Sequence, residues 1–102
     1  MFLEESDIQK REVIMYDKFL DKQVVVDVLG NFIYLGILSR IEDSWIELSD
    51  VDVHDMLASS STKEEYVINA RVTGIIANRK NVSIDRDKII STSLFSDIIL
   101  RN

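Results

Sequence analysis

Apolar and polar residues alternate between residues 23 and 54, and this pattern predicts three consecutive antiparallel strands. The first, 23–29, places alternating valines on one side. Gly30 and Asn31 follow, and because both tolerate positive φ they predict a two-residue hairpin turn. The second strand, 32–41, is apolar on both sides over its first half, which indicates that both faces are covered where the sheet curls back on itself.

Two features of these strands predict a bent sheet. Gly36 falls in the middle of the second strand, where a glycine often marks a bend or a close approach of two backbones. In the third strand, the apolar residues change sides between Leu48 and Val51, so we expect a bulge near Ser49 and Asp50. Bent strands joined by short turns predict a small barrel.

The segment 62–74 has two interpretations. Thr62 with Glu65 matches a capping box and Gly74 suits the residue after a helix, which together favour a helix. Alternation of apolar and polar residues over 68–73 favours a strand. We expect the helix.

The C-terminal third predicts two more strands. A polar, basic connection at 78–81 leads to strand 82–85, a tight turn at 86–87 and strand 88–94. The tail, 95–100, is apolar enough to pack against the domain.

A short amphipathic helix is predicted before the first strand. Asp7 suits its N-cap, and Ile8, Met15 and Phe19 would form its apolar stripe. We expect residues 1–6 to be frayed.

The composition indicates a single globular domain spanning residues 1–102. No cysteine is present, which excludes disulfides, thiolate metal sites and cysteine nucleophiles. We expect no membrane span, because no apolar run approaches about 18 residues, and no secretory signal, because the N-terminus lacks an apolar core. A cytoplasmic protein is therefore the expectation.

The net charge of −6 gives no general attraction to nucleic acid. The charge is uneven: residues 1–65 carry six basic and fifteen acidic residues, and residues 66–102 carry six and three. Only the C-terminal third could present a basic surface to a phosphate backbone.

Two motifs resemble those of the Sm-like (LSm-type) family. The first is carried by Gly36-Ile-Leu38, Ile41-Glu-Asp43 and Ile46-Glu-Leu48, and the second by Val82-Ser-Ile84-Asp-Arg86-Asp-Lys88-Ile89-Ile90. The chain looks like a divergent, bacterial-type member.

The resemblance implies a mainly β fold, a small bent five-stranded antiparallel barrel of the SH3-like kind. A helix would precede it, and an insertion at 56–81 would place a helix between strands three and four. In such proteins strand five of one subunit pairs with strand four of the next, so the resemblance implies a homo-oligomer, most simply a ring.

The RNA-binding residues of the family are largely altered. Asp43 matches the acidic residue of the turn before strand three, but Trp45 and Ile46 stand where an asparagine is expected. Asp85 stands where the family has an arginine, and Arg86 where it has a glycine. The residues left as an RNA site are Asp43, Trp45, Arg86 and Lys88.

Asp50, Asp52 and His54 recur at period two and could ligate a metal from one face of a strand. The same spacing is typical of the solvent face of a half-buried strand.

Three functional readings follow. The first is an Sm-like oligomeric binding or scaffolding module that has no cofactor and is not an enzyme. The second is an RNA-binding Sm-like protein with an altered base pocket. The third is a metal-dependent enzyme or sensor that uses Asp50, Asp52 and His54. Gly30, Gly36 and Gly74 are expected to have structural roles.

Overall fold

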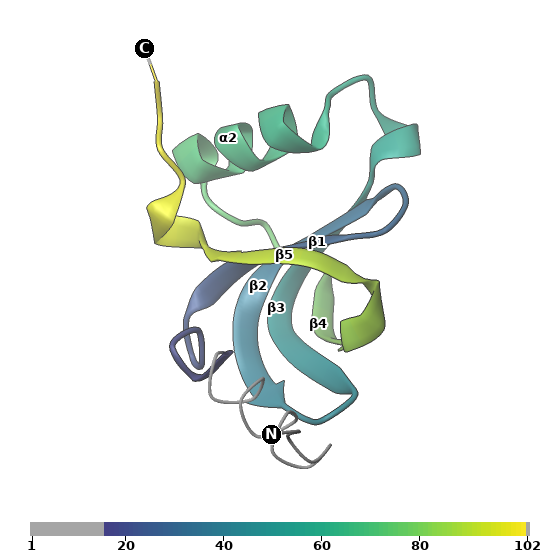
Figure 1. The fold of residues 1–102 in the computed structure, drawn as a ribbon. Helices are drawn as coiled ribbons and strands as arrows, with labels where there is room; N and C mark the ends of the chain where they lie inside the picture. The colour runs from purple at the N-terminus through teal and green to yellow at the C-terminus, as the bar shows by residue number, and fades with distance from the viewer. Residues whose placement is uncertain (1–15, 102) are drawn as a thin grey trace, which may run out of the picture.

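The computed structural model describes residues 16–101, and a bent five-stranded antiparallel sheet lies at its centre (Figure 1). The strands are β1 (Gln23–Val28), β2 (Phe32–Ile41), β3 (Trp45–Asp55), β4 (Arg79–Asp85) and β5 (Ile89–Leu94). They lie side by side in the order β4-β3-β2-β1-β5. The prediction of a mainly β fold with five antiparallel strands is confirmed. The predicted barrel closure is wrong: β4 pairs with β3 and β5 with β1, so within residues 16–101 the sheet is open at both edges.

The predicted bulge in β3 lies opposite the glycine of β2. The register of the two strands shifts between Leu35 and Ile37, so that Asp50 and Val51 both lie opposite Gly36. Asp50 has a φ of 50°, as a bulged residue can. A Cβ on Gly36 would lie 3.2 Å from the Cα of Val51, which is closer than side chains normally approach. Glycine is therefore required where the two backbones meet.

The inner face of the bent sheet carries the first hydrophobic core. Its buried residues come from four strands, and they are Val24, Val26, Val28, Leu38, Ile46, Leu48, Val51 and Ile84. Burial of each such side chain stabilises the fold by about 1.5–3 kcal/mol before entropy is counted. The alternation of the valines in β1 predicted this face correctly.

The outer face carries a second core, beneath the helix α2 (Lys63–Thr73). Val25, Ile33 and Leu35 of the sheet pack here against Val67 and Ala70 of α2 and against Phe95, which follows β5. Figure 1 shows α2 above the sheet, and the C-terminal segment rises beside it. The helix and Phe95, rather than the curl of the sheet, cover the outer apolar side of β2.

Both ends of α2 are capped by the residues that the sequence predicted. Oγ1 of Thr62 accepts a hydrogen bond from the backbone N–H of Glu65 at 3.1 Å, which satisfies a donor that the first turn leaves free. Gly74 ends the helix with a φ of 93°, and its N–H donates to the carbonyl of Ala70. The choice of helix over strand for this segment is confirmed.

Some predicted boundaries were wrong. The hairpin after β1 contains three residues, 29–31, instead of two, although Gly30 has the expected positive φ. β4 begins at Arg79, because the segment predicted as a polar connection pairs with β3 at an exposed edge. A single 3-10 turn, Arg86–Lys88, stands in place of the tight turn, and β5 begins at Ile89.

The predicted N-terminal helix and the frayed residues 1–6 lie outside the described residues, apart from Tyr16 and Asp17, which are helical, and the turn that follows them. Tyr16 and Phe19 pack against the first core. Within residues 16–101 no helix is long and apolar enough to cross a membrane.

Candidate functional site

The two open edges of the sheet are the first candidate site. β5 contains no charged residue along its six positions, and Ile90 is 58% exposed there. β4 carries Arg79 and Lys80 at one end and Asp85 at the other, with an uncharged centre. Unpaired strand edges present rows of N–H and C=O groups that can pair with another chain. Charged residues are the usual protection against such pairing, and β5 lacks them.

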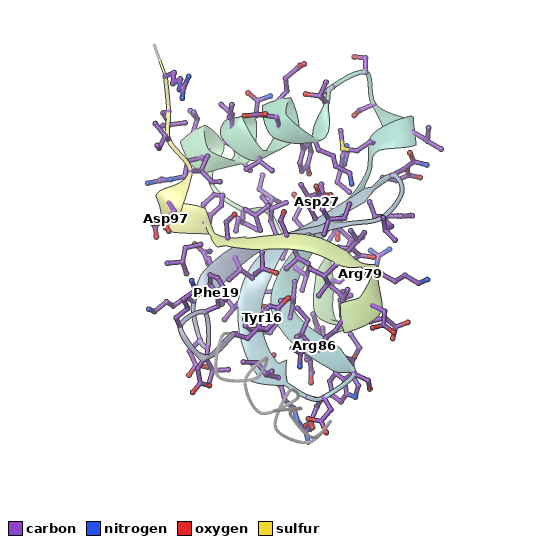
Figure 2. All side chains as sticks on the ribbon, viewed as in Figure 1. Tyr16, Phe19, Asp27, Arg79, Arg86 and Asp97 are labelled. Carbon is purple, nitrogen blue, oxygen red and sulfur yellow. The ribbon has the colours of Figure 1, made fainter. Side chains whose placement is uncertain are left out.

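The second candidate site is the turn between β2 and β3, where the sequence placed an RNA contact. Nη1 of Arg86 donates to the backbone carbonyl of Glu42 at 2.9 Å and to that of Asp43 at 3.3 Å. The guanidinium also lies 5.0 Å from the ring centroid of Tyr16, and Figure 2 shows the two residues side by side. Arg86 therefore fastens the turn to the segment that precedes β1.

Trp45 and Lys88 complete the predicted RNA set. Trp45 is half-buried, and the guanidinium of Arg40 lies 5.6 Å from its ring centroid. In the register of β3 with β4, Trp45 lies opposite Asp85, an acidic residue that opposes phosphate binding at this position. Lys88 is exposed at the end of the 3-10 turn. The structure thus brings Asp43, Trp45 and Arg86 to one turn, and Lys88 lies beyond it.

The third candidate site is formed by the three predicted metal ligands on β3, whose side chains differ in exposure. Asp50 is exposed on the bulge, Asp52 is buried at 7% exposure, and His54 is half-buried. Nε2 of His54 lies 3.1 Å from Oγ of Ser59. Within residues 16–101, no group of three His, Asp or Glu side chains is placed to hold a metal ion.

Asp52 instead belongs to a polar network between β3 and α2. The hydroxyl of Tyr66 donates to Oδ2 of Asp52 at 2.5 Å, and the ring of Tyr66 stacks on that of His54 with centroids 3.9 Å apart. Burial, followed by the hydrogen bond and the charge of Asp52, raises the pKa of Tyr66 well above its usual value. Tyr66 therefore stays a neutral phenol that donates to the carboxylate at ordinary pH.

Asn78, just before β4, closes this network from the other side. Its side-chain amide accepts from the N–H of Val53 at 3.0 Å and donates to the carbonyl of Val53 at 2.9 Å. Its Nδ2 also lies 3.4 Å from Oδ1 of Asp52. A hollow of about 370 Å³ opens beside these groups, between the C-terminal half of α2 and the segment that leads into β4.

A larger hollow of about 640 Å³ lies between α2, β1 and the C-terminal segment. Its lining includes apolar side chains of the second core and the carboxylates of Asp27 and Asp97, both labelled in Figure 2. Lys63 also lines this hollow, and its Nζ donates to Oδ1 of Asp27 at 2.5 Å and to the carbonyl of Val28 at 2.9 Å. This pair ties the first turn of α2 to β1.

Sequence reasoning missed Tyr66 and Asn78 as partners of Asp52. Tyr66 faces the sheet because it lies four positions before the buried Ala70, on the same face of α2. That signal is present in the sequence once the helix is assumed, although it does not specify which residue of β3 the hydroxyl meets.

No protein-family model and no curated protein matches the chain. Among solved structures, the fold is similar to that of a chain in the crystal structure of the NatC complex bound to CoA, with a TM-score of 0.50. The two chains share 16% sequence identity, and the match covers 92% of this chain and 87% of that chain. At this identity the similarity shows a shared fold alone.

Proposed function

We propose that the protein is a non-catalytic binding and scaffolding module of the Sm-like kind, which assembles with further copies of itself through the edges of its sheet. The observation that carries the proposal is the strand order, which leaves β4 and β5 as opposite edges that each pair on one side.

The chemistry of the two edges supports pairing between β4 and β5. β5 has six residues and β4 has seven, so one could pair with the other along nearly its whole length. The exposed Ile90 would lose contact with water in such a contact, and burying an isoleucine contributes about 1.5–3 kcal/mol. The absence of charged residues on β5 means that no desolvated charge opposes its burial.

The two edges differ in sequence, so the contact would be head-to-tail. A head-to-tail contact closes into a ring when the rotation between subunits permits it, and otherwise continues as a filament. Pairing with a different protein through the same edges is the alternative that the experiment must separate.

The assembly is tested by light scattering after size exclusion of the purified chain. We expect a mass several times that of the 11.8 kDa monomer at micromolar concentration. Ile90→Lys places a charge on the β5 edge and should shift the protein to smaller species. Leu57→Lys is the matched control, because Leu57 is 77% exposed and lies outside the strands.

A wild-type monomer at micromolar concentration would contradict self-assembly. Co-purification of the monomer with another protein, lost in Ile90→Lys and kept in Leu57→Lys, would assign the edge to a different partner. Equal dissociation by both variants would show that the β5 edge is not the contact.

A further inference from the structure

Asp52 has a buried carboxylate to which, among residues 16–101, no cation is hydrogen-bonded. Asp52 is 7% exposed, and its side chain is bonded by neutral groups, the hydroxyl of Tyr66 and the amide of Asn78. Buried carboxylates in proteins are normally paired with a cation or a metal, because removing a charge from water is costly. Each carboxylate oxygen can accept about two hydrogen bonds, so two donors leave half of this capacity unused.

The hollow of about 370 Å³ lies directly against this carboxylate. Asp52 contributes to its lining together with polar side chains of Tyr66, Asn69, Thr73 and Asn78, and its remaining wall is formed by small or apolar residues. The volume falls at the lower end of the range for ligand sites, which suits one side chain or a small molecule. A group that enters it meets one negative charge among hydroxyl and amide groups.

Three basic side chains on α2 and β4, the elements beside the hollow, interact with groups other than Asp52. Arg79 donates from Nη1 to the carbonyl of Asn78 at 2.9 Å. Lys63 is bound to Asp27, and the guanidinium of Arg71 lies 5.7 Å from the ring centroid of Phe95. Among residues 16–101 none of these three cations is bonded to Asp52, so a cation from outside the chain could occupy the site.

We propose that this hollow is a recognition pocket for the guanidinium group of an arginine side chain from a partner protein. A guanidinium is planar and can donate two parallel hydrogen bonds to one carboxylate, with further N–H groups for hydroxyl and amide acceptors. It is also less strongly hydrated than an ammonium group, so it loses less on entering a half-buried site. The acidic net charge of −6 favours approach of a basic segment.

The proposal is tested by ¹⁵N NMR titration of the full chain with N-acetyl-arginine methylamide, using the citrulline analogue as the neutral isostere. We expect saturable shifts of the amides around Asp52, Asn69 and Asn78, with a dissociation constant of about 1 mM. The citrulline compound should cause no saturable shift. The lysine analogue should bind at least several-fold more weakly than arginine.

Two variants of equal charge separate the pocket from the general acidity of the protein. Asp52→Asn should abolish the saturable shifts, whereas Asp50→Asn, which removes the exposed carboxylate two residues away, should leave them unchanged. If Asp52→Asn does not fold, Asn69→Lys serves as the second variant: it keeps the carboxylate, places a cation at the exposed rim of the hollow and should abolish the saturable shifts.

Three results would overturn the proposal. They are no saturable shift with the arginine compound, equal shifts with citrulline, and arginine binding that Asp50→Asn weakens as much as Asp52→Asn does. Binding of free guanidinium as tight as that of the arginine compound would assign the pocket to small guanidine compounds, and would contradict a peptide partner. These chemical shifts report on the pocket alone, so the test does not depend on whether the protein self-assembles.

Discussion

Gly36 on β2 lies so close to Ser49 on β3 that a Cβ on the glycine would stand 3.0 Å from the serine carbonyl oxygen. This contact occurs beside the bulge at Asp50, where the sheet bends around its inner core. Because this oxygen and the Cα of Val51, at 3.2 Å, belong to the backbone, they cannot move aside as the end of a side chain could.

Gly36→Val should therefore lower the free energy of unfolding by about 1–3 kcal/mol or more, through crowding and backbone strain. Urea denaturation followed by the fluorescence of Trp45 measures the change. Ser83→Val, at an exposed position of β4, is the control and should change stability by less than about 0.5 kcal/mol. A Gly36→Val protein as stable as the wild type would show that the two strands can separate here without cost.

Tyr66→Phe should destabilise the protein by about 1–3 kcal/mol, because it leaves the buried carboxylate of Asp52 without its shortest hydrogen bond. Tyr34→Phe is the control, since Tyr34 is half-buried on β2 and its hydroxyl bonds to none of residues 16–101. Equal stability of the two variants would mean that the bond to Asp52 contributes nothing net.

The raised pKa of Tyr66 also predicts a loss of stability in alkaline solution. The unfolded chain releases this proton near pH 10, whereas the folded protein holds it to higher pH. The contribution of Tyr66 is therefore complete below about pH 10 and declines as the pH rises from there towards the folded pKa. Denaturation curves between pH 8 and about 11 should show a steeper fall for the wild type than for Tyr66→Phe. Parallel curves would contradict the assignment.

Thr62→Ala should lower the free energy of unfolding by about 0.5–2 kcal/mol, since it removes the side-chain acceptor at the start of α2. Ser60→Ala, two residues earlier at an exposed position, is the matched control and should be nearly neutral. Thermal melts of the two variants provide the comparison. Because α2 covers the second core, loss of its cap should also speed amide exchange in the helix more than in β3.

Uridine-rich RNA should bind poorly at physiological salt, because the net charge is −6 and Asp85 lies opposite Trp45. Fluorescence anisotropy with a labelled oligonucleotide measures the affinity. Asp85→Arg should strengthen any residual binding more than Asp87→Arg does, although both change the charge equally. An equal gain would attribute the effect to net charge alone, and tight uridine-selective binding by the wild type would overturn the expectation.

The sequence by itself determined the elements whose signals lie within a few residues. The bounds of β2 agree with the alternation pattern and its polar turns, and the ends of α2 agree with Thr62, Glu65 and Gly74. The change of sides in β3 predicted the bulge beside Ser49. Such signals can be read directly, because strand periodicity, caps and turns depend on neighbouring backbone groups.

The tertiary structure alone decided the contacts between distant segments. Only packing placed α2 over the outer face, joined the hydroxyl of Tyr66 to Asp52 and left that carboxylate beside a hollow. It also extended β4 back to Arg79, because an edge strand needs only backbone pairing on one side and tolerates polar residues. These outcomes depend on contacts between residues that are far apart in the sequence, as Tyr66 and Asp52 are, 14 positions apart. A local pattern predicts which face of a strand or helix is apolar, but it does not predict which other element covers that face.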